Sequence, residues 1–366
     1  MNRLLQILPR VPPAVCGVGD YAWNLALALE QHEGISSRFL SAGTTWTDPG
    51  PAATRFPVHR LARLSAKALL DWVRGHAAEF DAILLHLSPY GFQKRAVPFW
   101  LAAAVRLLAQ TRGLPSIITY FHELFASGPP TSSTFWLQPL QKRVLRHIAR
   151  GSSARLTNRQ AYADWLDEHP GARATEVIPV FSNLGELANP PALADRPPAM
   201  LLFASSNHSG EPVEALIQRA GHWARAFGLD RLHVIGRLAN PPPRMERVTL
   251  ECHGYLAAEQ ASALLAGSRL GFTAYNPAYL AKSGFFASQA AHGMVVIAQG
   301  RATNLPDGLI HGVHLLNESQ LDPSALPDAQ ALQKLASSLH AWYRFHDLRA
   351  TAARTAAAAR LQHSPA

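Results

Sequence analysis

The stretch Ala281–Ala298, which reads AKSGFFASQAAHGMVVIA, contains one complete unit of the fold. Small and aromatic residues that suit a helix lead to Gly293, and the apolar run Met294–Ala298 that follows is typical of a buried strand. A helix, a glycine and a buried strand in this order are the repeating pattern of an α/β protein. Lys282 and Ser283 stand at the start of the helix, and the stretch contains no acidic residue. This raises the question of what binds at a helix N-terminus that carries a positive charge.

The same alternation of strand and helix patterns extends along the whole chain. Apolar runs such as LLQIL, AILLHLS and PSIITYFH alternate with helical patterns in residues 1–182, and runs such as AMLLFASS, RLHVIG and LGFTAY do so in residues 200–335. The pattern predicts parallel sheets covered by helices on both faces, so we expect two doubly wound, Rossmann-like α/β domains. Residues 183–199 contain proline pairs without periodicity and are predicted as the linker, and residues 336–366 are predicted as a C-terminal helix.

Composition limits the classes of partner and compartment. Lys and Arg number 34 against 25 Asp and Glu, a net charge of +9 with 17 His counted as neutral, which favours anionic partners. The basic residues are spread along the chain, so we favour anionic small molecules or a membrane surface over nucleic acid. Cys16 and Cys252 are far apart and form neither a disulfide framework nor a metal-ligand spacing, which indicates a cytoplasmic protein. The longest apolar helix candidate, VPFWLAAAVRLLAQ, contains Arg106 and is too short to span a membrane.

Ligands of open parallel sheets bind at the carboxyl ends of the strands, and we expect the two domains to face each other across a crevice there. In the first domain, the loop PPAVCGVGDYAWNLA places Gly17 and Gly19 before a helix, where the backbone can approach a ligand closely. Asp20 is either part of that site or a cap of the helix. The dinucleotide pattern G-x-G-x-x-G is incomplete, because position 22 is Ala, so a nicotinamide-dependent oxidoreductase is disfavoured.

Two further strand ends in this domain carry polar side chains. His122 and Glu123 follow the strand in SIITYF, where a histidine can bond a sugar hydroxyl or relay a proton; the alternative is a structural histidine at the start of a loop. The segment HLSPYGFQKR brings an aromatic ring, Tyr90, and a cation, Arg95, to the end of the preceding strand. These residues suit a sugar or a phosphate, and the alternative is a solvated loop.

The second domain carries the corresponding candidates for an anion. Strand-end segments supply Ser205 and Ser206 in FASSNHSG, Arg237 in VIGR, and Tyr255 in CHGYL, a tight loop that can read a nucleobase with its backbone. At the helix in the opening stretch, the dipole and the charge of Lys282 both favour a phosphate. The alternative is that Ser283 caps the helix and Lys282 is solvated.

Taken in order, these segments resemble the GT-B-fold glycosyltransferases, in particular the retaining, glycosyltransferase family 4-like group of bacterial enzymes. The resemblance rests on CGVGDYA, FHE, HVIGR, CHGYLAAEQASALLAGSRLGFTAY and KSGFFASQAAHGMVVIA, and it covers most of the chain. It implies a nucleotide-sugar donor on the C-terminal domain, an acceptor on the N-terminal domain, and a C-terminal helix that crosses back to the first domain. It also implies transfer with retention of the anomeric configuration.

The chain departs from this family at two places. The family commonly carries Glu-x7-Glu at the opening stretch, and alignment on Gly293 puts Leu280 and Ser288 at those positions. The segment SSNHSG replaces the family's usual Arg and Lys, which leaves Lys282 and Arg237 as the available cations. These departures motivate an alternative function, a glycosyltransferase-like binding or regulatory protein without catalysis.

The resulting hypothesis is a hexosyltransferase that uses a nucleotide diphosphate sugar as co-substrate, with no cofactor and no metal ion. Its setting would be bacterial cell-envelope or exopolysaccharide synthesis, with a glycan or lipid-linked acceptor, at the inner face of the plasma membrane. The predicted catalytic residues are His122, Asp20 and Lys282; the donor-binding residues are Ser205, Ser206, Arg237, Tyr255, Lys282, Ser283, Gly284 and Ser288; the acceptor-binding residues are Gly17, Gly19, Tyr90, Arg95 and Glu123.

Overall fold

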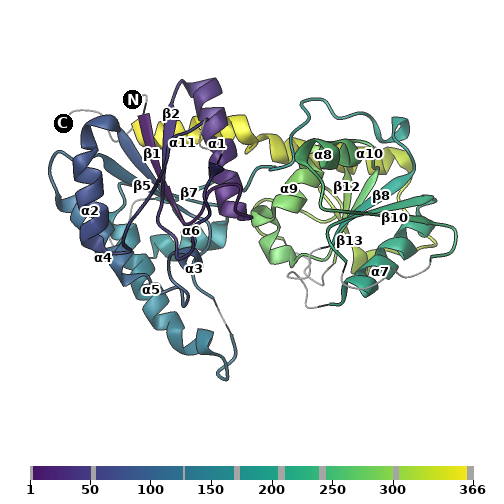
Figure 1. Ribbon diagram of the computed structural model, residues 1–366. Coiled ribbons are helices and arrows are strands. Elements are labelled where there is room, and N and C mark those ends of the chain that lie inside the picture. Colours follow the sequence, from purple (N-terminus) through teal and green to yellow (C-terminus); the bar gives the residue numbers. More distant parts are fainter. Residues whose placement is uncertain are drawn as a thin grey trace. The chain divides into compact units, whose positions relative to one another are not determined.

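The computed structural model describes residues 3–50, 55–126, 128–168, 174–204, 211–238, 245–299 and 305–360. The chain forms two compact units: unit 1 comprises Met1–Ile178 and Leu348–Ala366, and unit 2 comprises Pro179–Asp347. Each unit has its own parallel sheet with helices packed on it (Figure 1). The predicted pair of doubly wound, Rossmann-like domains is confirmed.

The sheet of unit 1 has seven strands in the order β3-β2-β1-β4-β5-β6-β7. The strands are β1 (Arg3–Leu8), β2 (Ser36–Ser41), β3 (Val58–Arg60), β4 (Ala82–Leu87), β5 (Ser116–Phe121), β6 (Ala154–Thr157) and β7 (Glu176–Val177). The helices are α1 (Gly17–Glu33), α2 (Ala66–Gly75), α3 (Pro89–Phe92), α4 (Phe99–Gln110), α5 (Ser133–Gly151), α6 (Gln160–Asp167) and α11 (Leu348–Arg360), with a 3-10 turn, η2, at Ala77–Glu79.

Strand β4 shows why this sheet is covered on both faces. All six of its residues are buried, which is typical of a central parallel strand. Ile83 and Leu85 join the larger apolar cluster with residues of α2, α4 and α5, whereas the alternate position His86 lies on the opposite face, where its ring meets that of Tyr21 from α1. A polar side chain is therefore enclosed between the sheet and α1.

The sheet of unit 2 has six strands in the order β10-β9-β8-β11-β12-β13. The strands are β8 (Ala199–Phe203), β9 (Arg231–Ile235), β10 (Thr249–Gly254), β11 (Leu270–Thr273), β12 (Val295–Ala298) and β13 (Leu316–Asn317). The helices are α7 (Val213–Ala226), α8 (Ala258–Ala266), α9 (Gly284–Ala291) and α10 (Ala329–Arg344), and the 3-10 turns are η3 (Leu193–Asp195), η4 (Pro277–Lys282) and η5 (Glu318–Gln320).

The opening stretch has the predicted structure. It forms the end of η4, then α9, Gly293 and the fully buried strand β12. Gly293 has a φ of +62°, and a Cβ at this position would lie 2.7 Å from the Cβ of Pro190. Glycine is therefore required here both by the left-handed backbone and by the close neighbour. Pro190 belongs to the segment 183–199, which packs within unit 2: the Arg196 guanidinium donates to the carbonyls of Ser268 and His292.

The C-terminal helix returns to the first domain, as predicted. Helix α11 contacts α1, and two ion pairs tie it to unit 1: Arg354 with Glu176 at 2.6 Å and Arg360 with Glu33 at 3.0 Å. The structure differs from the prediction in dividing the expected helix 336–366 in two, because α10 ends at Arg344 and α11 begins at Leu348. Among the helices of the described residues, none is long and apolar enough to cross a membrane.

Candidate functional site

Each sheet has one point at which the strand order reverses direction. In unit 1 this switch point lies between β1 and β4, and in unit 2 it lies between β8 and β11. The carboxyl ends of the strands beside a switch point diverge into loops on opposite faces of the sheet, which leaves a site for a ligand. Most of the predicted site residues that the structure describes lie at or beside the carboxyl edges of the two sheets.

A chain of hydrogen-bonded polar side chains leads from the interior of unit 1 to the end of β5. Gln6 Nε2 donates to Ser37 Oγ (2.9 Å), Gln6 Oε1 lies 2.7 Å from His86 Nε2, and His86 Nδ1 lies 3.0 Å from His122 Nε2. All four side chains are buried. Buried polar groups of this kind are stable only when each has a partner, so the chain fixes the orientation of every member.

The hydrogen bonds determine the tautomers of the two histidines. Because the Gln6 amide nitrogen donates to Ser37, its oxygen accepts from His86 Nε2–H. Burial lowers the pKa of His86 to about 3, so the ring is neutral at pH 7 and its Nδ1 accepts a hydrogen bond. His122 therefore donates through Nε2–H, which in the neutral ring makes Nδ1 the acceptor nitrogen. The Tyr120 ring stacks on His122 at 4.3 Å between centroids and the Tyr21 ring meets its edge at 4.9 Å.

The loop between β1 and α1 contains the predicted glycines and Asp20. A Cβ at Gly19 would lie 2.6 Å from the carbonyl oxygen of Arg10, so this position requires glycine, whereas a Cβ at Gly17 would meet nothing within 4 Å. Cys16 is the N-cap residue of α1 and makes no side-chain capping bond. Asp20 follows in the first turn, inside the helix, and is not its cap. Burial raises the pKa of the Asp20 carboxyl.

The other predicted acceptor residues lie after β4 and β5. Ser88 Oγ donates to Glu123 Oε2 at 2.8 Å, which joins the ends of the two adjacent strands. Tyr90, in the short helix α3, is exposed. Arg95 is exposed on the loop between α3 and α4, where its backbone nitrogen donates to the Gln93 side chain. The structure thus brings His122, Glu123 and Ser88 together and leaves Arg95 on the surface.

In unit 2 the ends of β9 and β10 border an open cleft of about 390 Å³. The backbone N–H of Gly236 donates to the carbonyl of Gly254 at 2.7 Å, and the two glycines have φ values of +122° and +64°. A Cβ at Gly236 would lie 2.6 Å from the carbonyl of Ala204. Arg237 and Tyr255 line the cleft, and Tyr255 is 82% exposed. Leu238 and Cys252 complete the lining, so the cleft combines two glycines with one cation and one aromatic ring.

A second, small cavity of about 20 Å³ lies at the switch point between β8 and β11, and Ser283 and Phe285 at the start of α9 line it. Ser283 Oγ accepts from the backbone nitrogen of Phe286 at 3.3 Å, so this serine is the N-cap of the helix. The backbone N–H groups of Gly284 and Phe285 belong to the first turn, at the positive end of the helix dipole. The ammonium of Lys282, just before the cap, lies 5.6 Å from the centre of the Tyr279 ring.

The remaining donor-site predictions fall in other surroundings. Ser205 and Ser206 lie outside the residues that the structure describes. Ser288 is 1% exposed, donates to the carbonyl of Gly284 at 2.8 Å and lies 2.9 Å from Ser182 Oγ. Leu280, at the other position of the family's glutamate pair, is buried as well. Both positions therefore belong to the interior of unit 2.

Three residues around His86 and His122 were not predicted from the sequence: Gln6 and Ser37, which belong to the hydrogen-bonded chain, and Tyr21, whose ring contacts both histidines. Gln6 carried a signal: it is the only polar residue in the apolar run LLQIL, and a polar side chain within a central strand requires a buried partner. The identity of that partner depends on which strands are neighbours, and the sequence does not state this.

No protein-family model matches the sequence, and no curated protein is significantly similar to it. Solved structures are similar in fold. An α-glucosyltransferase in complex with UDP and a 13-mer DNA has a TM-score of 0.57 at 10% identity, over 98% of both chains. A putative UDP-N-acetylglucosamine 2-epimerase from Listeria monocytogenes has a TM-score of 0.60 at 15% identity, over 99% of this chain and 97% of the other. The lipopolysaccharide outer core galactosyltransferase WaaB in its apo form has a TM-score of 0.58 at 10% identity, over 99% of this chain and all of the other. The chain therefore has the GT-B fold.

Proposed function

We propose that the protein is a glycosyltransferase that moves a sugar from a nucleotide diphosphate sugar to an acceptor hydroxyl, with retention of configuration. The observation that carries this proposal is the pairing of two features along the carboxyl edge of one sheet in unit 2. One is the open cleft lined by Gly236, Gly254 and Tyr255, which suits a nucleobase. The other is the N-terminus of α9 with Lys282 beside it, which suits a diphosphate.

The chemistry requires negative charge to be stabilised on the departing nucleoside diphosphate. The first-turn N–H groups of α9 and the ammonium of Lys282 supply positive charge where that charge develops, and Arg237 adds a third donor from the end of β9. Because these groups of the chain supply the positive charge, the proposed transfer step uses no metal ion. Tyr255 offers a ring on which the base can stack.

Unit 1 supplies the acceptor side of the proposal. His122 is held by His86 and by two aromatic rings, with Nδ1 as its acceptor nitrogen, so it can accept a hydrogen bond from a sugar hydroxyl. Asp20 has a raised carboxyl pKa, which suits a group that exchanges a proton. Gly17, Gly19, Tyr90, Arg95 and Glu123 are the proposed acceptor-binding residues. Ser288 has no part in the site, because its hydroxyl is bonded inside unit 2.

A panel of UDP-, GDP- and dTDP-sugars tests this function, with released nucleotide and sugar products identified by chromatography. We expect nucleotide release, accelerated by an acceptor, and loss of release in Lys282→Ala. Binding detected by thermal shift without turnover would support the catalytically inactive alternative. Conversion of UDP-N-acetylglucosamine to a product with an altered sugar would show that the protein is a 2-epimerase, the activity named for one of its structural neighbours. If the protein neither binds nor turns over any sugar of the panel, the glycosyltransferase, the inactive binding protein and the epimerase are all excluded.

We also propose that the acceptor is lipid-linked and is met at an anionic membrane surface. The support is the exposed side of α5, whose 19 residues contain no acidic side chain. Trp136 and Leu140 are exposed near its start, and Arg143 and Arg150 are exposed towards its end, at helical spacing. A helix with exposed aromatic and aliphatic residues next to cations is suited to the interface of a bilayer. This placement agrees with a role in bacterial cell-envelope or exopolysaccharide synthesis at the inner face of the plasma membrane.

Vesicle sedimentation tests the membrane surface. We expect the protein to sediment with phosphatidylglycerol vesicles and not with phosphatidylcholine vesicles, and to lose most of this binding when Trp136→Ser and Leu140→Ser are combined. Phe345→Ser, a change at an exposed aromatic residue of unit 2, is the matched control and should bind as the unchanged protein does. Equal sedimentation of all three proteins would contradict the assignment to α5.

A further inference from the structure

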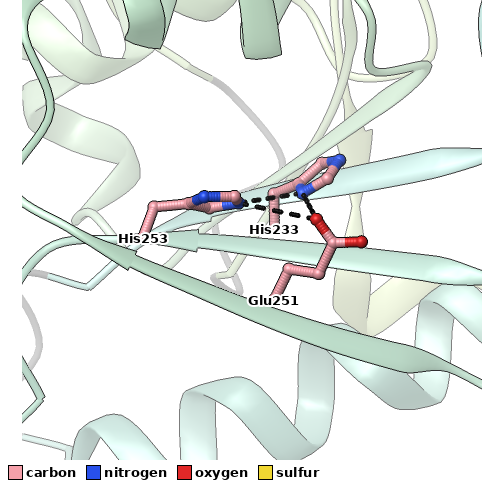
Figure 2. Close-up of side chains that lie close together, drawn as sticks. All are labelled: His233, Glu251 and His253. Atoms are coloured by element: carbon pink, nitrogen blue, oxygen red, sulfur yellow. Dashed lines mark hydrogen bonds and ion pairs between the residues drawn. The ribbon is translucent and has the colours of Figure 1, made fainter.

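Three side chains with metal-binding atoms converge on the β9–β10 pair, and none of them is among the residues that line the proposed donor cleft. His233 on β9 is paired in register with Glu251 on β10, and His253 lies two residues further along β10, where the register shifts between Cys252 and Gly254. Figure 2 shows the two imidazole rings and the carboxylate pointing toward one another. His233 Nδ1 lies 3.1 Å from His253 Nε2 and 3.3 Å from Glu251 Oε2, and the last two atoms are 3.9 Å apart.

These distances match those between ligands of one ion. Two ligand atoms that bind Zn²⁺ at about 2.0–2.1 Å with a tetrahedral angle lie about 3.3–3.4 Å apart, and about 2.9 Å apart at a right angle. Two of the three separations fall within this range, and the third exceeds it by about 0.5 Å, which rotation of the partly exposed Glu251 side chain can close. Among the described residues, this is the one group of three or more His, Cys, Asp or Glu side chains with such geometry.

The surroundings hold two of the ligands in place. The His233 side chain is 9% exposed and that of His253 is 23% exposed, so both rings are fixed by packing, whereas Glu251 is 36% exposed and leaves the site open on one side. Arg231 Nε lies 3.3 Å from the other carboxylate oxygen, Glu251 Oε1, and so orients Oε2 toward the histidines.

We propose that His233, Glu251 and His253 bind a single divalent transition-metal ion, with Zn²⁺ as the ion that two imidazoles and one carboxylate suit best. The ion would cross-link β9 to the edge strand β10 directly before the Gly254–Tyr255 turn. Three protein ligands leave a coordination position open on the exposed side. The site does not depend on the proposed glycosyltransferase activity, and the ion has no part in the transfer step described above.

The experiment uses the full-length chain, stripped of metal with a chelator and titrated with ZnCl₂ in a calorimeter. We expect one high-affinity Zn²⁺ per chain, a rise in melting temperature on addition of Zn²⁺, and visible absorption bands when Co²⁺ replaces it. Glu251→Gln and His253→Asn should each weaken binding by about 100-fold or more, because each removes one of three ligands. Their melting temperatures in chelator should equal that of the unchanged chain, which shows that the variants fold.

Two matched controls separate this site from the other histidines and acids of the chain. His222→Asn on α7 and Glu259→Gln on α8 alter exposed residues of the same unit and should leave Zn²⁺ affinity unchanged. Without an ion, the three groups form a hydrogen-bonded cluster that shares one proton between the rings, and this arrangement is the competing explanation. Failure of the unchanged chain to bind Zn²⁺ above background, or equal binding by the ligand variants and the controls, would overturn the proposal.

Discussion

The carboxyl edges of the two sheets are built in different ways. In unit 1 the edge is formed by interior side chains: Gln6, His86 and His122 are bonded in series and buried. In unit 2 the edge is formed by backbone and surface: two glycines with positive φ, an exposed arginine, and a tyrosine that is 82% exposed. The edge of unit 1 is held in place by its own hydrogen bonds without a ligand, whereas the edge of unit 2 presents groups that are available to bind one.

This difference predicts that substitutions at the two edges affect different properties, stability at the edge of unit 1 and activity at the edge of unit 2. A buried polar chain loses much of its stability when one member is removed, because the neighbours are left without partners. Lys282, a half-buried cation beside a helix N-terminus, contributes less to folding, because it is not part of such a buried chain. Changes in unit 1 should therefore destabilise the fold, and changes in unit 2 should reduce activity.

The largest effect is expected from Lys282→Ala. Under the proposed function, removal of this charge should lower kcat/KM for nucleotide-sugar turnover by about 10²–10³-fold, the usual result of removing one preorganised donor from a developing negative charge. The melting temperature should stay within about 1–2 °C of the unchanged protein. Lys334→Ala, at an exposed lysine of α10, is the control for the loss of one positive charge and should retain full activity. A large fall in stability without a change in turnover would reverse the comparison.

Gln6→Leu makes the opposite change in unit 1. The substitution leaves His86 Nε2–H and Ser37 Oγ without their partner in a buried environment, so we expect a loss of about 2–4 kcal/mol in stability. Hydrogen exchange of the β1 and β4 amides measures this loss within unit 1. Gln110→Leu, at the exposed end of α4, should change the same exchange rates by less than about 0.5 kcal/mol equivalent. Similar effects from both variants would show that the buried chain is not a source of stability.

The loop before α1 allows a sharper comparison between two neighbouring glycines. Gly19→Ala introduces a methyl group 2.6 Å from the Arg10 carbonyl oxygen and should cost about 1–3 kcal/mol. Gly17→Ala meets open space at the first helical position and should be neutral or stabilising by up to about 1 kcal/mol. Denaturation of the two variants under one set of conditions measures the difference, and equal stabilities would mean that the loop moves to accept the methyl group.

Local periodicity was sufficient to predict the fold from the sequence, whereas the site required pairings between distant strands. Both sheets and the helix–strand unit at α9 and β12 follow from residue patterns a few positions long. The pairing of Glu251 with His233 depends on register, and this explains why the metal-ligand cluster was not predicted: its residues show no recognisable ligand spacing in sequence. The break between α10 and α11 contains neither Gly nor Pro, so no residue there signals the end of a helix.

The smallest effect, and the most specific to the buried chain of unit 1, is its dependence on pH. The pKa of His86 falls from 6.5 in the unfolded state to about 3 in the fold, so between these values the unfolded state binds the additional proton. Stability is therefore independent of this group above about pH 7 and decreases as the pH falls, approaching about 1.4 kcal/mol per pH unit well below 6.5. Between pH 7 and pH 6 the loss should be about 0.7 kcal/mol.

Other buried histidines add losses of the same sign. The measurement is therefore the difference in stability between the unchanged chain and His86→Gln, monitored by hydrogen exchange of the β4 amides. That difference should shrink by about 0.7 kcal/mol at the lower pH. A difference that stays constant would mean that His86 is already open to solvent protons in the folded protein, and the rigid edge of unit 1 would then resemble the open edge of unit 2.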